Sequence, residues 1–271
     1  FDRANDEQGG HMAEAIYMRG LVQRRCGESG RRYFEQALSE NPRYCNARVA
    51  MGMLSLESGD RNEARQRFQA ALDADENCMP AYANIALLQA ENPAQVGDAL
   101  ISLSSALALD SDFMPAFNEM ALIYFRTGVR THNSGMIDLA HIVCEQATMI
   151  DANYAPIYNT WGLIRLYRED INEALRFFLR ARTLDSSIYE AQINFGNITF
   201  QFRGYQDAYE AYSRAAELQP RSYDAAVGLG AALRGRQRDD EAKAQFERAI
   251  QIDANRPEAY FTLGQLFQSY M

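Results

Sequence analysis

Residues 158–181 read YNTWGLIRLYREDINEALRFFLRA, and residues 192–215 read QINFGNITFQFRGYQDAYEAYSRA. The second stretch repeats the pattern of the first at a spacing of 34 residues. The matched pairs are Gly162 and Gly196, Ala174 and Ala208, Phe178 and Tyr212, and Ala181 and Ala215. Small and aromatic residues that recur at one fixed period of this length are typical of repeats made of two antiparallel helices.

The same pattern extends over nearly the whole chain. Glycine or alanine recurs at one position of each expected first helix: Gly52, Ala86, Ala121, Gly162, Gly196 and Gly230. Alanine recurs at one position of each expected second helix: Ala64, Ala99, Ala140, Ala174, Ala208 and Ala242. Small side chains let the two helices approach closely, and the aromatic residues fill the remaining space. Because one hairpin cannot bury its apolar face alone, neighbouring hairpins must stack.

This pattern resembles the tetratricopeptide repeat (TPR) family. The resemblance implies an all-α fold, a right-handed superhelix (α-solenoid) of about seven helix-turn-helix repeats plus a terminal helix. We expect a single solenoid over residues 1–271. The expected segments are the end of an upstream repeat at 1–11, repeats at 12–44, 45–78, 79–113, 114–154, 155–188, 189–222 and 223–256, and the terminal helix at 257–271.

The fourth expected repeat carries an insertion. We expect residues 129–136 to lengthen the loop between its two helices, because insertions in solenoids usually fall in loops on one edge. A loop without a function is the favoured interpretation, and contact with a second partner is the alternative.

The charge of the chain bears on its partners. The formal net charge is −9, and Lys243 is the one lysine. Since binding to a phosphate backbone depends on basic side chains, we expect no nucleic-acid partner. The sequence holds no apolar run of about 18 residues, so we expect membrane contact only through a lipid anchor upstream of this sequence.

The four cysteines are Cys26, Cys45, Cys78 and Cys144, and none forms a C-x-x-C pair. A chain of this size does not need disulfides for stability, so we predict none. Cys45 and Cys78 lie near equivalent junctions of neighbouring repeats, which leaves a bond between them as the alternative. We interpret Cys144 as a small buried hydrophobic residue.

Catalytic and metal-binding patterns are sparse. His141 and Cys144, one helical turn apart, have a spacing that suits a metal, but no second pair accompanies them. The glycines form neither a dinucleotide-binding fingerprint nor a phosphate-binding loop. We therefore expect no catalytic residue, no metal site and no cofactor, and we predict that the chain is not an enzyme.

In the TPR family, a concave groove is lined by residues of the first helices that point away from the second helices. The resemblance implies these polar groove residues here: Asn84, Asn118, Glu119, Asn159, Asn194 and Asn197. It implies these apolar ones: Met53, Leu87, Leu122, Phe125, Leu163, Leu166 and Phe200. A row of asparagine amides can hold the backbone of an extended peptide, and apolar pockets can supply affinity. The alternative is that the asparagines only keep a helix face hydrated.

Two known groove chemistries of the family can be compared with these residues. The carboxylate clamp of chaperone-binding members needs lysines on first helices, and Lys243 falls on an expected second helix, so the clamp is absent. The asparagine ladder of the nucleocytoplasmic sugar-transferase superhelix is similar in part. Asn84 and Asn194 have the matching offset, whereas Asn118 and Asn159 come one residue early.

The family resemblance implies a scaffold that binds a segment of another protein in this groove. Residues 194–197 (NFGN) and 203–205 (RGY) also resemble bacterial envelope TPR lipoproteins of pilus or gliding-motility machinery. That second resemblance implies a periplasmic, outer-membrane-associated protein in a motility, pilus or secretion complex. The alternatives are a targeting or substrate-recruiting domain of a larger enzyme, a cytoplasmic adaptor, and self-assembly of the solenoid.

Overall fold

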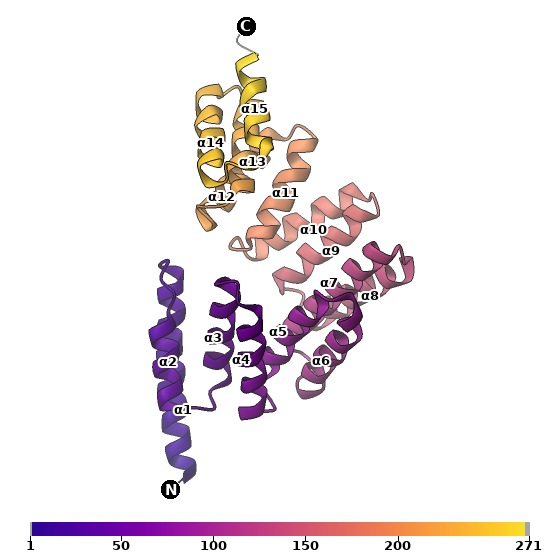
Figure 1. Ribbon diagram of the computed structural model, residues 1–271. Coiled ribbons are helices and arrows are strands. Elements are labelled where there is room, and N and C mark those ends of the chain that lie inside the picture. The colour runs from indigo at the N-terminus through magenta and orange to yellow at the C-terminus, as the bar shows by residue number, and fades with distance from the viewer. Residues whose placement is uncertain (1, 269–271) are drawn as a thin grey trace. The chain divides into compact units, whose positions relative to one another are not determined.

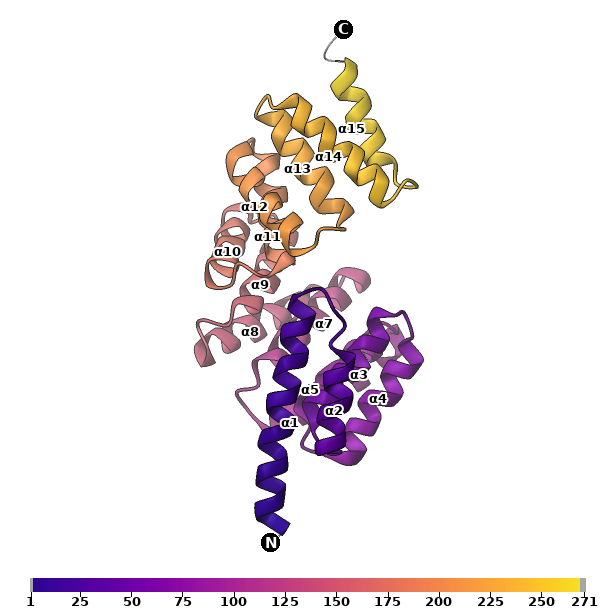
Figure 2. The same cartoon turned by 90° about the vertical axis from the view of Figure 1, so that its left-hand side faces the viewer.

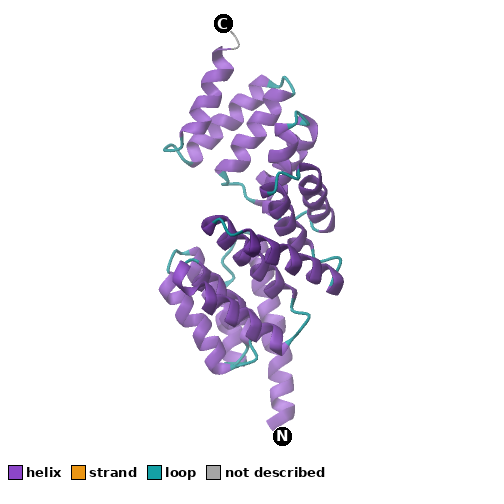
Figure 3. Ribbon diagram, turned by 90° about the vertical axis from the view of Figure 1, so that its right-hand side faces the viewer, coloured by secondary structure: helices purple, strands orange, loops and turns teal. Residues whose placement is uncertain are grey.

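The computed structural model describes the backbone of residues 2–268 and the side chains of residues 12–268. Within this part the chain forms fifteen α-helices, one short 3-10 helix and no strand (Figure 1, Figure 3). The first helices are α1 (Asp2–Arg25), α2 (Arg31–Glu40), α3 (Cys45–Glu57), α4 (Arg61–Ala74), α5 (Met79–Ala90), η1 (Pro93–Gln95), α6 (Val96–Leu109), α7 (Met114–Thr131) and α8 (Ser134–Ile150). The others are α9 (Ala155–Tyr167), α10 (Ile171–Leu184), α11 (Tyr189–Gln201), α12 (Tyr205–Leu218), α13 (Tyr223–Gly235), α14 (Asp239–Ile252) and α15 (Pro257–Gln268). The all-α prediction is confirmed.

The helices pack in consecutive pairs. One compact unit ends at Val143, and a second begins at Cys144, within α8. In the first unit α1 packs with α2, α3 with α4 and α5 with α6. In the second unit α9 packs with α10, α11 with α12 and α13 with α14, the last pair lying side by side in Figure 2. The predicted helix-turn-helix pairing is therefore confirmed, and the exact repeat boundaries and the single solenoid remain proposals.

The close approach within each pair depends on the predicted small residues. A Cβ atom on Gly52 would lie 2.4 Å from the ring of Phe68, and one on Gly162 would lie 2.5 Å from the ring of Phe178. Side chains essentially never come so close, so only glycine allows the ring to lie against the facing helix. Both phenylalanine rings are fully buried, as the sequence pattern predicted.

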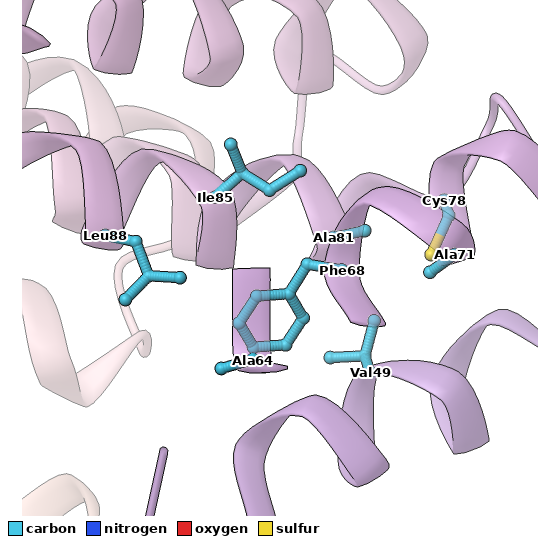
Figure 4. Packing of buried hydrophobic residues seen from close by; sticks show 8 residues of the cluster. All are labelled: Val49, Ala64, Phe68, Ala71, Cys78, Ala81, Ile85 and Leu88. Carbon is cyan, nitrogen blue, oxygen red and sulfur yellow. The ribbon is translucent and has the colours of Figure 1, made fainter. Parts of the chain in front are cut away.

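Successive pairs share one core. Figure 4 shows the ring of Phe68 on α4 among side chains of its own and neighbouring helices, and the buried cluster includes Val49 of α3 together with Ile85 and Leu88 of α5. The apolar face of one pair is therefore covered by the first helix of the next, which is the reason that hairpins of this kind must stack.

The insertion in the fourth repeat does not form a loop, so that prediction was wrong. Only His132 and Asn133 separate α7 from α8. The extra residues lengthen the helices instead: α7 has 18 residues where α9 has 13, and α8 has 17 where α10 has 14. Because these residues are added at the end of α7 and at the start of α8, the periodic positions of each helix keep their spacing and their buried faces.

The prediction that the chain contains no disulfide was also wrong. Cys45, the first residue of α3, is bonded to Cys78, which precedes α5, and their Cα atoms are 5.5 Å apart. Cys144 is buried, as predicted, and Cys26 is exposed with a free thiol. The argument from chain size failed because it did not consider where the cysteines lie. Stacking of the pairs brings the starts of the successive first helices α3 and α5 together, and Cys45 and Cys78 stand at those two starts. The prediction for residues 1–11 concerns side chains that lie outside the described residues.

Candidate partner-binding surface

The predicted groove residues fall into two sets, one in each unit. The first unit contains Met53 on α3, Asn84 and Leu87 on α5, and Asn118, Glu119, Leu122 and Phe125 on α7. The second unit contains Asn159, Leu163 and Leu166 on α9, and Asn194, Asn197 and Phe200 on α11. All are half-buried except Asn197, which is exposed. This degree of burial suits side chains at the surface of a groove but does not by itself distinguish them from the edge of the core.

In the second unit two predicted asparagines contact each other. The Asn194 amide nitrogen donates to the Asn159 oxygen at 2.9 Å, which joins α11 to α9. The Tyr212 hydroxyl donates to the Asn197 oxygen at 2.7 Å. Burial raises the pKa of Tyr212, so its hydroxyl keeps the proton that it donates. An asparagine amide can make up to about four hydrogen bonds, so these contacts hold the side chains in place without using their full capacity.

In the first unit the predicted asparagines form hydrogen bonds within their own helices. The Asn84 amide donates to the Pro80 carbonyl oxygen of its own helix at 2.7 Å. The Asn118 amide donates to Glu119 at 3.4 Å. Burial raises the pKa of Glu119, with the Arg126 charge and the Asn118 hydrogen bond opposing the rise. The amides of Asn84 and Asn118 are therefore held, at least in part, against groups of their own helices.

Several apolar groove residues also pack against the core. Met53 lies against the cluster around Phe68, and Leu163 and Leu166 lie against the cluster around Phe178. The ring of Phe200 is 5.7 Å from that of Tyr205, centroid to centroid. These side chains therefore stabilise the stacking of the repeats, and only part of each remains available to a ligand.

Two predicted residues line hollows in the first unit. Met53 borders one of about 320 Å³ with Tyr17 and Leu21. Leu87 borders another of about 270 Å³, whose wall includes Arg126 and Arg130 of α7. The two arginines were missed in the sequence, although the insertion that lengthens α7 was a signal that this segment differs.

Another hollow lies away from the predicted residues, in the second unit. It measures about 640 Å³ and lies beside the loops that follow α9 and α11. Acidic Glu169, Asp170 and Asp207 border it together with the exposed ring of Phe202. Asp170 also accepts a hydrogen bond from the Glu173 backbone at the start of α10, so part of this acidity caps a helix.

Neither metal nor membrane sites were found in the described part of the chain. No group of three histidine, cysteine or acidic residues there could hold a metal ion. Burial raises the pKa of the Cys144 thiol, which agrees with its interpretation as a small buried hydrophobic residue. No described helix is both long and apolar enough to cross a bilayer.

Residues 28–91 match the family model described as tetratricopeptide repeat. Among curated proteins, the UDP-N-acetylglucosamine--peptide N-acetylglucosaminyltransferase of Giardia intestinalis is 26% identical over 144 residues, which is 53% of this chain and 10% of the relative. The chain thus spans about a tenth of that protein's length.

Several solved structures share the fold. The Cut9–Hcn1 hetero-tetramer of the APC/C has a TM-score of 0.61 at 17% identity, over 86% of this chain and 44% of that one. The pilF protein of Pseudomonas aeruginosa has a TM-score of 0.60 at 17% identity, over 84% and 97%. TTC0263 of Thermus thermophilus has a TM-score of 0.59 at 19% identity, over 70% and 98%. At these identities the likeness concerns the fold.

Proposed function

Because this chain is a tetratricopeptide repeat protein, we propose that it is a non-enzymatic scaffold that binds an extended segment of a partner protein along the first helices of its repeats. The observation that carries the proposal is the contact between Asn159 and Asn194, which places two amides side by side on successive first helices. The hollows beside Met53 and Leu87 support an equivalent surface in the first unit.

The chemistry of these residues suits a peptide backbone better than one particular side chain. Amide groups both donate and accept hydrogen bonds, so they can pair with the N–H and C=O groups of any extended segment. The partly exposed side chains of Leu163 and Phe200 would then contact apolar side chains of the segment and supply affinity.

We further propose that the protein acts in a bacterial envelope complex for motility, pilus assembly or secretion, in the periplasm and associated with the outer membrane through an upstream lipid anchor. The bond between Cys45 and Cys78 supports a compartment outside the cytosol, because disulfides rarely persist in reducing cytosol. A cytoplasmic adaptor is the competing proposal.

A second candidate function is a substrate-recruiting domain of a larger enzyme. The observation that favours it is the match to the Giardia transferase over 144 residues, which covers a small part of that enzyme. Under this proposal the same groove would hold a substrate segment instead of a structural partner.

The groove proposal can be tested by affinity capture with the immobilised oxidised protein, using separate soluble and envelope fractions of the source organism. The test variant is Asn159→Ala with Asn194→Ala. The matched control is Asn62→Ala with Asn172→Ala, which removes two exposed asparagines from the second helices α4 and α10. Circular dichroism checks that both variants keep their helicity.

We expect envelope proteins that bind wild type and control to be lost from the groove variant. Overlapping peptides of a captured protein would then locate the bound segment. Equal capture by all three proteins would contradict the groove, and capture from the soluble fraction alone would favour the adaptor. A captured set of modified substrates, rather than a stable complex, would favour the enzyme-domain alternative.

A further inference from the structure

A pocket on another face of α9 combines aromatic rings with arginines. It measures about 530 Å³ and lies in the second unit between α9 and α10, next to the end of α8. Its walls include Tyr158, Trp161 and Arg165 of α9 and Arg176, Phe177 and Arg180 of α10. The α9 residues are spaced by three and four, so they form one stripe, which lies about two fifths of a turn around the helix from the groove residues Asn159 and Leu163.

The aromatic rings of the pocket form a stack. The Trp161 ring lies parallel to that of Phe177, with centroids 4.3 Å apart and planes 15° apart. The ring of Tyr158 lies 6.2 Å from that of Phe177. In the next pair, Phe195 and Ala211 stand at the positions of Trp161 and Phe177, so the stack is not part of the general packing of the repeat.

Arg165 is an exception to the pattern of its position. The residues 34 and 68 positions later are Thr199 and Leu233, and both are buried. The Arg165 Nε atom is buried and meets no hydrogen-bond acceptor among the described residues. Its Nη1 atom lies 3.6 Å from Asp170, which is long for an ion pair. A buried guanidinium donor without an acceptor is unfavourable, so Arg165 is incompletely paired, and 24% of its side chain remains exposed beside the pocket, where an acceptor can bind its other nitrogens.

The other two arginines differ in how far they are paired. Arg176 forms an ion pair with Glu173 at 2.5 Å, and its guanidinium lies 5.2 Å from the centroid of Phe177. Arg180 donates only at 3.4 Å, to the neutral oxygens of Ala152 and Asn153, and lies 5.7 Å from the centroid of Tyr158. Arg165 and Arg180 therefore offer positive charge beside the half-buried ring of Trp161.

The hydrogen bond from Arg180 to a backbone carbonyl recurs at the same position of the next two pairs. Arg214 and Arg248, at the same position in the next two pairs, donate to the Ser186 and Pro220 carbonyl oxygens at 3.2 and 2.7 Å. Each bond spans 28 residues, as does that of Arg180 to the Ala152 oxygen. The longer distance at Arg180 and the aromatic stack beside it are what distinguish this pocket from its neighbours.

We propose that this pocket binds an acidic segment of a partner protein, with a carboxylate on Arg165 and Arg180 and an adjacent apolar side chain against Trp161. Guanidinium groups form strong charge-assisted hydrogen bonds with carboxylates, and they remain charged at all relevant pH values. Three arginines face two glutamates around the pocket, so its lining is cationic on a chain of net charge −9. The site is separate from the groove and does not depend on the proposed function.

Trp161 supplies the measurement, because it is the one tryptophan of the chain. The probe is the blocked peptide acetyl-Phe-Glu-Glu-Phe-amide, and the matched control is acetyl-Phe-Gln-Gln-Phe-amide. We expect a saturable change in Trp161 fluorescence with the acidic peptide, and an affinity at least about tenfold lower for the control or at high salt. Equal responses to both peptides, or none to either, would overturn the proposal. An equal fluorescence response to inorganic phosphate would contradict the acidic peptide as ligand and would assign the pocket to a free anion.

Three variants localise the binding. Arg165→Gln should weaken binding of the acidic peptide by about tenfold or more, because it removes the partly buried guanidinium. Arg214→Gln is the matched control, since it removes the repeated carbonyl contact outside the pocket and should leave affinity unchanged. Asn159→Ala with Asn194→Ala should also leave it unchanged, which separates this site from the groove. If Arg165→Gln fails to fold, Arg180→Gln takes its place. Wild-type affinity in a folded arginine variant would refute the assignment.

Discussion

The junction between successive first helices is held by different chemistry in the two units. In the first unit a disulfide joins Cys45, at the start of α3, to Cys78, just before α5. In the second unit the residues at the corresponding places of α11 and α13 are Tyr189 and Ser222, whose hydroxyl oxygens are 2.6 Å apart. Both pairs are separated by 33 residues. One backbone geometry thus accepts either a covalent bond or a hydrogen bond.

The next junction of the second unit uses a larger polar network. The Tyr223 hydroxyl donates to the Arg256 carbonyl oxygen at 3.2 Å and accepts from the backbone N–H of Ala259 at 2.9 Å. The Arg256 guanidinium lies 3.9 Å from the centroid of the Tyr223 ring. These contacts act in the folded state, whereas a disulfide acts largely by restricting the unfolded chain. The two units should therefore respond differently to reductant and to mutation.

Removing the disulfide should give the largest effect. We expect Cys45→Ala with Cys78→Ala to lower the free energy of unfolding by about 2–4 kcal/mol, because the unfolded chain loses a closed loop. Urea unfolding with and without reductant measures the change. Reductant should destabilise the wild type by a similar amount and leave the double variant unaffected. Cys26→Ala, which removes an exposed free thiol, is the control and should change little. A wild type indifferent to reductant would mean that the bond does not form.

Tyr223→Phe should have the next largest effect. It removes the acceptor of the buried Ala259 N–H and leaves that donor unsatisfied, which should cost about 1–3 kcal/mol. Thermal and urea unfolding provide the measurement, with Tyr260→Phe on the exposed face of α15 as the matched control. A loss no greater than that of the control would show that the hydroxyl network does not stabilise this junction.

Tyr189→Phe should destabilise less. Its hydroxyl contacts the Ser222 hydroxyl in a half-buried site, and Ser222 also accepts from the Ala225 backbone N–H. Since Ser222 keeps that partner, we expect a loss of about 0.5–1.5 kcal/mol. The comparison predicts that the loss in free energy of unfolding decreases in the order disulfide removal, Tyr223→Phe, Tyr189→Phe. Unfolding curves of the three variants in one buffer would test this order. An effect of Tyr189→Phe as large as that of the disulfide would reverse the comparison.

The 34-residue period was sufficient to predict the helix pairs, because it reports where small and aromatic side chains must meet. It also placed Cys45 and Cys78 at equivalent junctions. Whether they bond depends on the distance and direction of the side chains, which a period does not contain. The lengthened α7 was missed for a related reason. An insertion between two helices leaves the periodic positions within each helix unchanged, so the sequence pattern does not reveal whether it forms helix or loop.

The candidate sites were harder to predict than the fold. The asparagines were predicted from their position to line a groove, and that role stays a prediction, while the structure shows Asn159 and Asn194 in contact. The pocket at Arg165 was missed because its aromatic residues resemble core positions. A signal was present: a charged residue occupies a position where Ser55, Thr199 and Leu233 are buried. Whether its guanidinium has a partner can be judged only from coordinates.

The two units also differ in the loops that join the two helices of a pair, and substitutions there should give the smallest change in stability. The loop after α3 has Gly59 at φ 87°, whereas the loop after α9 has Glu169 at φ 61°. A residue with a Cβ atom in this left-handed region has a conformational free energy about 1–2 kcal/mol less favourable. Glycine avoids that strain but loses more backbone entropy on folding, which costs about 0.5–1 kcal/mol of free energy. Glu169→Gly should therefore stabilise the protein by up to about 1 kcal/mol.

Gly59→Ala is the reciprocal change and should destabilise by a similar amount. A Cβ atom at Gly59 would meet nothing within 4 Å, so the loss would report backbone conformation alone. Thermal unfolding of both variants tests the pair. Glu169→Gly could instead destabilise the protein while Gly59→Ala gives the expected loss. The Glu169 side chain would then make a favourable contribution at the border of the acidic hollow, and this contribution would outweigh its backbone strain. That outcome would show that the two units differ in their stabilising interactions at this loop as well as at the junctions between first helices.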